Sequence, residues 1–87
     1  MIHLADLRIH GSDGNAKIVK AVVCGTPANI DWAKNGHMAE VTLLVDERAL
    51  GPVEVGATLA ELDGEHWVIA GLNEGSSMVS VRLRHRE

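Results

Sequence analysis

The chain has 87 residues, a formal net charge of −4 at pH 7 and one cysteine, Cys24. This length predicts one small domain over residues 1–87, with a core that stabilises it only modestly. A single cysteine excludes an internal disulfide framework. No apolar run reaches the roughly 20 residues that a membrane-spanning helix needs, so we expect no membrane partner.

The core has to come from Val, Leu, Ile and Ala, because the only large aromatic residues are Trp32 and Trp67. Charge is unevenly spread, with acidic residues concentrated between residues 40 and 65 and arginines near the C-terminus. An acidic middle argues against a general nucleic-acid coat, which needs a basic face. The asymmetry fits either a solvated surface or head-to-tail contact between like subunits.

The first 24 residues predict a hairpin of two strands. Two pairs of apolar residues are spaced two apart, Ile2 with Leu4 and Leu7 with Ile9. The first pair falls on even positions and the second on odd positions, so the alternation changes phase between them. The slip at Ala5-Asp6 favours a strand with a bulge, and a short helix is the alternative. Residues 11–15 form a turn cluster, and the β-branched segment 17–24 predicts the returning strand.

Residues 25–36 predict the longest irregular stretch, because glycine ends it on both sides and Pro27 and Asn35 lie inside it. Loops this long in a small domain are often functional or mobile. The stretch also holds Ile30 and Trp32, whose side chains are poorly suited to water. Either they fold back over an open edge of the core, or they bind a partner. Both are candidate partner-binding residues.

The next segment predicts a strand over residues 38–45, followed by one helical turn. Asp46 suits the N-cap of that turn and Gly51 suits its end. Residues 52–56 then lead in extended form into the second half of the chain.

The strongest local signal is the Asp63-Gly64 pair between two strand-like runs, 58–62 and 65–71. Two-residue Asp-Gly turns are favoured in hairpins because both positions need positive φ. The final run, 78–84, alternates apolar and polar residues and predicts a last strand. The fold class is therefore all-β, a small barrel or sandwich of about six antiparallel strands with one short helical turn and one long loop.

Catalytic chemistry has little support in the sequence. The five histidines show no pair at i, i+4 on a helix, and no Cys-x-x-Cys occurs. Ser76 and Ser77 lack the Gly-x-Ser-x-Gly setting of an activated nucleophile. We therefore expect no enzyme activity, no catalytic residues, no cofactor and no metal.

One charged pattern stands out at the C-terminus. Arg82, Arg84 and Arg86 alternate along the last strand, so they project from one side in a line about 13 Å long. Such a row can contact phosphates, an acidic patch on a neighbouring subunit, or only water. The three arginines are candidate partner-binding residues.

Four segments together resemble a known family: Leu43-Leu44-Val45-Asp46-Glu47, Val55-Gly56-Ala57-Thr58-Leu59, Leu62-Asp63-Gly64-Glu65-His66-Trp67-Val68-Ile69 and Val79-Ser80-Val81-Arg82-Leu83. In this order, with an Ala-Val strand and a long loop before them, they resemble the small head–tail joining proteins of long-tailed bacteriophages, also called head completion or connector proteins. The resemblance spans residues 17–84.

The resemblance implies a structural virion protein with a β-barrel subunit. Such subunits are monomeric when free and assemble as a ring, expected to be a hexamer, in the neck of the virion. There they contact portal (connector) proteins and tail proteins, after assembly in the host cytoplasm. Ile30 and Trp32 would be anchors of a loop that orders on docking. Contact of the pore face with DNA stays open, as does a place among the related neck and tail-tube proteins.

A rival interpretation is a small β-barrel that binds nucleic acid or a ligand. Against it stand the net negative charge and the lack of aromatic residues interleaved with basic ones, which a single-strand-binding surface uses.

Overall fold

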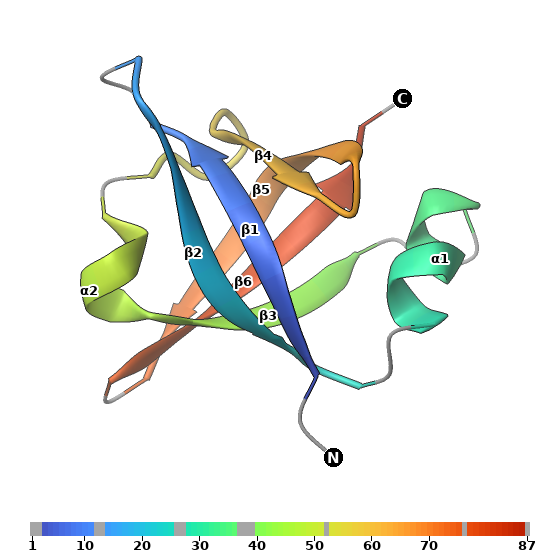
Figure 1. Cartoon of the computed structure of the whole chain (residues 1–87), viewed down its shortest axis with the longest axis horizontal. Helices are drawn as coiled ribbons and strands as arrows, with labels where there is room; N and C mark the ends of the chain where they lie inside the picture. Colours follow the sequence, from blue (N-terminus) through green and yellow to red (C-terminus); the bar gives the residue numbers. More distant parts are fainter. Residues whose placement is uncertain are drawn as a thin grey trace.

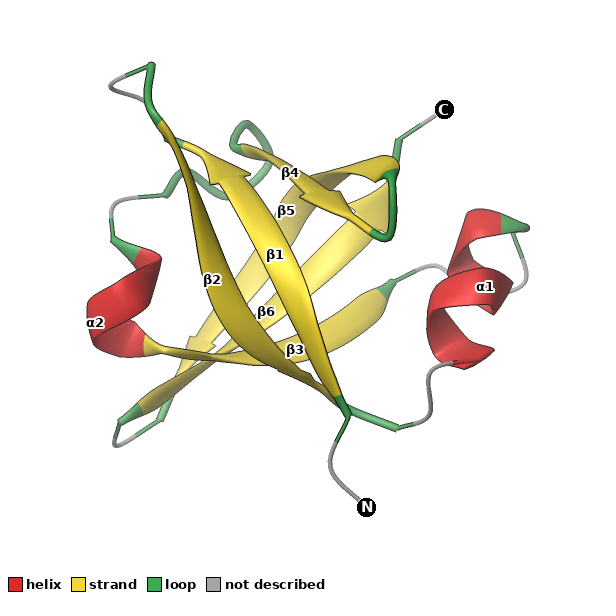
Figure 2. Cartoon of the chain, viewed as in Figure 1, coloured by secondary structure: helices red, strands yellow, loops and turns green. Residues whose placement is uncertain are grey.

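The computed structural model describes residues 3–11, 14–25, 28–36, 40–51, 53–75 and 77–86. This part of the chain forms a closed antiparallel barrel with two short helices outside its wall (Figures 1 and 2). The strands are β1 (Leu4–His10), β2 (Ala16–Val23), β3 (Val41–Asp46), β4 (Leu59–Leu62), β5 (Glu65–Glu74) and β6 (Met78–His85). The helices are α1 (Ala28–Lys34) and α2 (Glu47–Leu50).

Around the barrel the strand order is β1-β2-β3-β6-β5-β4, and β4 pairs back onto β1. The small all-β barrel predicted from the sequence is therefore confirmed. Closure matters for so short a chain, because it leaves few strand edges exposed. It also brings together segments far apart in sequence, since His10 of β1 lies opposite Leu59 of β4.

The core fills the barrel with the inward residues of each strand, as period-two alternation requires. Its largest fully buried side chains are Trp67, Leu7, Ile9, Leu43, Leu62, Ile69 and Leu83. Trp67 is 0% exposed, and its indole Nε1 donates a hydrogen bond to the Leu62 carbonyl oxygen at 3.0 Å. Its ring also meets that of His85 edge to face, with centroids 5.0 Å apart. Trp67 thus links β4, β5 and β6.

The Asp-Gly hairpin is confirmed. Leu62 pairs with Glu65 across a two-residue turn, in which Asp63 has φ 54° and Gly64 has φ 75°. Both values lie in the left-handed region, where glycine is unstrained and Asp is tolerated.

The first segment is a strand, as predicted, but the predicted bulge is wrong. β1 pairs with β2 in one continuous register, from Leu4 opposite Val22 to His10 opposite Ala16. The slip in the apolar pattern arises because Leu4 lies on the outer face, 63% exposed, while Leu7 and Ile9 point inward. Ile2 lies outside the described residues.

The prediction of an irregular loop over residues 25–36 is also wrong, because α1 occupies most of its described part. Ile30 and Ala33 form the buried side of the helix, at the i, i+3 spacing of one helical face. A seven-residue helix is marginal alone, so these contacts with the barrel stabilise it. In the described part of the chain, neither helix has the length and apolar character to cross a bilayer.

The predicted helical turn is confirmed as α2. The Asp46 carboxylate accepts a hydrogen bond from the Arg48 backbone N–H at 2.8 Å, and Gly51 follows the helix with φ 68°. The predicted extended lead over 52–56 is wrong at Val55 and Gly56, which belong to a turn over residues 55–57, and Pro52 lies outside the described residues. The strand predicted over 38–45 is confirmed from Val41 onward as β3, Glu40 lies before the strand, and Met38 and Ala39 lie outside the described residues.

Candidate functional site

Helix α1 is fixed to the barrel on one side. Ile30 is 8% exposed and belongs to the core, so it folds back over the barrel as one of the two sequence interpretations proposed. Lys34 Nζ lies 2.9 Å from Asp63 Oδ2 in the β4–β5 turn. At the other end of the helix, Asn29 Nδ2 donates to the Cys24 carbonyl oxygen at 3.3 Å. These contacts hold the helix at both ends and along its buried face.

Trp32 lies on the same helix but is 53% exposed. Asp31 beside it is also exposed, whereas Ile30 and Ala33 are buried. Trp32 therefore lies on the side of the helix that faces away from the barrel. A large aromatic side chain presented to water on a fixed element is the typical anchor of a protein interface. The partner-binding roles of Ile30 and Trp32 stay predictions, and of the two it is Trp32 that offers a contact surface.

The hydrogen bond to Asp63 raises the pKa of Lys34 above its ordinary value. A lysine whose pKa is higher in the folded state contributes stability below its unfolded pKa, and this contribution is lost as pH rises through the folded pKa. The link between α1 and the β4–β5 turn is therefore present at neutral pH and is lost when Lys34 loses its proton in strongly alkaline solution.

Replacing Lys34 with Met keeps much of the aliphatic side chain but removes the ion pair. We expect amide hydrogen exchange in α1 to become faster, by up to about fivefold, because an exposed pair contributes little and acts locally. Exchange in the strands should not change. Hydrogen exchange followed by NMR measures both, with Lys34→Arg as the charged control. Unchanged exchange in α1 would show that the ion pair adds nothing measurable to the contacts of Asn29, Ile30 and Ala33.

The arginines lie on the outer side of the barrel. Arg82 and Arg84 are exposed on β6, and Arg86 follows the strand, exposed, with its N–H bonded to the His66 carbonyl oxygen at 2.9 Å. Arg82 also lies 3.7 Å from the carboxylate of Glu40. The predicted row therefore lies along the solvent-facing side of one strand, and no described contact tests whether it binds a partner.

A β-bulge that the sequence did not reveal shapes this row. The pairing of β5 with β6 shifts between Ile69 and Gly71, which puts Gly71 directly opposite Arg82. The Arg82 guanidinium lies so close to Gly71 that a Cβ at this position would collide with it. Glycine at this place lets the arginine lie along the wall rather than project from it.

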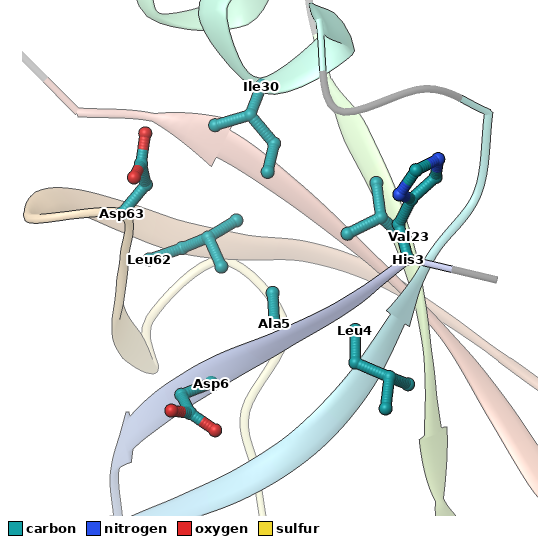
Figure 3. Close-up of a pocket in the computed structure, with 8 residues that line it drawn as sticks. All are labelled: His3, Leu4, Ala5, Asp6, Val23, Ile30, Leu62 and Asp63. Atoms are coloured by element: carbon teal, nitrogen blue, oxygen red, sulfur yellow. The ribbon is translucent and has the colours of Figure 1, made fainter.

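A hollow of about 510 Å³ lies between β1, α1 and the β4–β5 turn (Figure 3). In Figure 3 the side chains of Ala5, Ile30 and Leu62 point into it from three different elements. Its lining residues are His3, Leu4, Ala5, Asp6, Val23, Ile30, Leu62 and Asp63. This hollow could not be predicted from the sequence, because its walls come together only when the barrel closes.

Ionisable side chains form pairs and groups of three. His10 Nε2 lies 3.1 Å from Glu61 Oε2, and His85 Nε2 lies 3.5 Å from Glu65 Oε2. Glu61 Oε2 also lies 3.7 Å from Arg8 Nε, and Lys34 Nζ also lies 3.7 Å from Asp31 Oδ1. Among the described residues, no group of three or more His, Cys, Asp or Glu side chains is placed to hold a metal ion.

The structure thus places the predicted candidates on two elements, with Trp32 outward on α1 and the arginine row outward along β6. Comparison of the chain with protein-family models, with curated proteins and with solved structures found no match.

Proposed function

We propose that this chain is a structural subunit that joins the DNA-filled head of a long-tailed phage to its tail by protein–protein contact. The observation that carries the proposal is the outward Trp32 on a helix that Ile30 and Lys34 fix to the barrel. A side chain of this size in water has a cost that burial in an interface removes. The choice of head–tail joining among interface functions rests on the motif resemblance, which implies a β-barrel subunit of this kind.

The charge distribution supports assembly into a ring. Arg82 and Arg84 are exposed on β6, whereas Asp46, Glu47 and Glu54 are exposed around α2 and the segment after it. Opposite charges on different surfaces of one subunit favour a head-to-tail contact between copies. In the proposed ring, the arginine row of one copy faces the acidic surface of the next.

An in vitro joining assay tests the proposal. Purified chain is added to DNA-filled heads that lack it, together with free tails, and joined particles are counted by electron microscopy. Restored joining supports the proposal.

Heads that stay tailless and lose DNA, although circular dichroism shows the chain to be folded, would overturn the proposal. Titration with single-stranded DNA at several salt concentrations would then test the rival function, because phosphate contacts weaken steeply as salt increases.

A further inference from the structure

Strand β1 is paired along its whole length on one side and along less than half of it on the other. With β2 it pairs from Leu4 to His10. With β4 it pairs only from Arg8 to His10. On the N-terminal side of Arg8, from Leu4 to Leu7, β1 and β4 are not paired. Among the described residues, no other strand pairs with this side of β1.

The register shows which backbone groups face the unpaired side. The Val23 N–H donates to the His3 carbonyl oxygen at 2.8 Å, across the β1–β2 ladder. In an antiparallel ladder, the residues that bond to one neighbour alternate with those that face the other. The backbone groups of Ala5 and Leu7 therefore face β2, and those of Leu4 and Asp6 face away from it. No backbone hydrogen bond joins Leu4 or Asp6 to another described residue on that side.

The hollow of about 510 Å³ adjoins this free edge, since Leu4, Ala5 and Asp6 all line it. The floor is apolar, with Ala5, Ile30 and Leu62 pointing inward (Figure 3). A strand added to the edge would direct alternate side chains toward this floor, because strand side chains alternate between the two faces.

The two carboxylates at the rim are already paired with lysines. Lys20 Nζ lies 2.6 Å from Asp6 Oδ1, and Lys34 Nζ lies 2.9 Å from Asp63 Oδ2. A charged side chain entering the hollow would therefore find no free counter-charge on these two carboxylates, and burying it unpaired is costly. The charge pattern selects an uncharged, apolar side chain.

We propose that an extended peptide segment of a partner protein adds as a strand to the Leu4–Asp6 edge of β1 and inserts one apolar side chain into the hollow. Leu4 and Asp6 each offer one backbone N–H and one C=O on the unpaired side. These groups are spaced so that an extended chain can form hydrogen bonds with them. Ile30 of α1 and Asp63 of the β4–β5 turn line the same hollow, so a strand added to this edge would also contact α1 and the turn. This inference goes beyond head–tail joining and needs no virion component.

The test starts from a bead library of random heptapeptides screened against the full chain. The best binders are resynthesised and titrated into ¹⁵N-labelled protein. We expect apolar residues at alternate positions of the binders, and amide shifts at Leu4, Asp6, Ile30 and Leu62. Amide exchange at Leu4 and Asp6 should slow in the complex. Exchange at Leu7, whose N–H faces β2, should stay unchanged.

Two variants of one residue separate the backbone from the side chain. Asp6→Pro removes the outward N–H, a change that edge strands tolerate, and should weaken peptide binding at least about tenfold. Asp6→Ala keeps the N–H and should bind at least about fivefold more tightly than Asp6→Pro. Four outcomes would each overturn the proposal. They are unchanged peptide binding by Asp6→Pro, amide shifts confined to other strands, self-association through this edge in place of peptide binding, and a library without binders. The shift and exchange mapping on the unaltered chain decides the outcome if Asp6→Pro fails to fold.

Discussion

Replacing Trp67 with Ala is expected to lower the free energy of unfolding by about 3–5 kcal/mol. The indole is 0% exposed, so its removal leaves a cavity in the core. It also leaves the Leu62 carbonyl without its 3.0 Å donor and the His85 ring without its edge-to-face partner. Native domains are stable by only about 5–15 kcal/mol, so this loss removes a large share of the total. Urea denaturation followed by circular dichroism measures it.

The control is Trp67→Phe, which keeps an aromatic ring in the core but cannot donate to Leu62. We expect it to lose less than the Ala variant, because much of the buried apolar volume remains. A loss below about 1 kcal/mol for Trp67→Ala would contradict the central place of this side chain in the core.

Replacing Trp32 with Ala is expected to change stability little but to weaken head–tail joining strongly. The free energy of unfolding should fall by less than about 1 kcal/mol, because the side chain is half exposed and the helix is held by other residues. Head–tail joining should fall at least about tenfold, since a central aromatic anchor often accounts for 2 kcal/mol or more of binding. Denaturation and the joining assay measure the two effects on the same preparation.

Trp32→Phe is the matched control, because it keeps an aromatic contact surface and should retain more joining than Trp32→Ala. A large loss of stability in Trp32→Ala would contradict this prediction, because it would show that Trp32 stabilises the core. Normal joining by a folded Trp32→Ala variant would show that the outward face of α1 does not dock onto a partner.

The parts of the fold that sequence predicted are those fixed by neighbouring residues. The Asp63-Gly64 turn has a local requirement for positive φ, so its sequence identifies it. The alternation in residues 78–84 likewise fixes which side of β6 faces the core. Asp46 caps α2 through a hydrogen bond two residues away. Each of these features needs no knowledge of distant segments.

The parts that sequence missed depend on distant contacts. Helix α1 has too few residues to form by itself, and it is stabilised by packing of Ile30 and by the bond from Lys34 to Asp63, 29 residues away. The outward position of Leu4 depends on pairing with β2. Trp32 was identified as a candidate by its chemistry, but only the orientation of α1 shows that it is exposed and that Ile30 is not.

The strand order also has a consequence for synthesis of the protein. β6 is the last of the described strands along the chain, yet in the barrel it lies between β3 and β5. Until the ribosome has translated Met78–His85, the place of β6 between β3 and β5 is empty, and the barrel cannot close. We therefore expect the barrel to close only after β6 has left the ribosome. Ribosome-bound chains stalled before Met78 should be degraded by protease, whereas chains released after β6 should resist it.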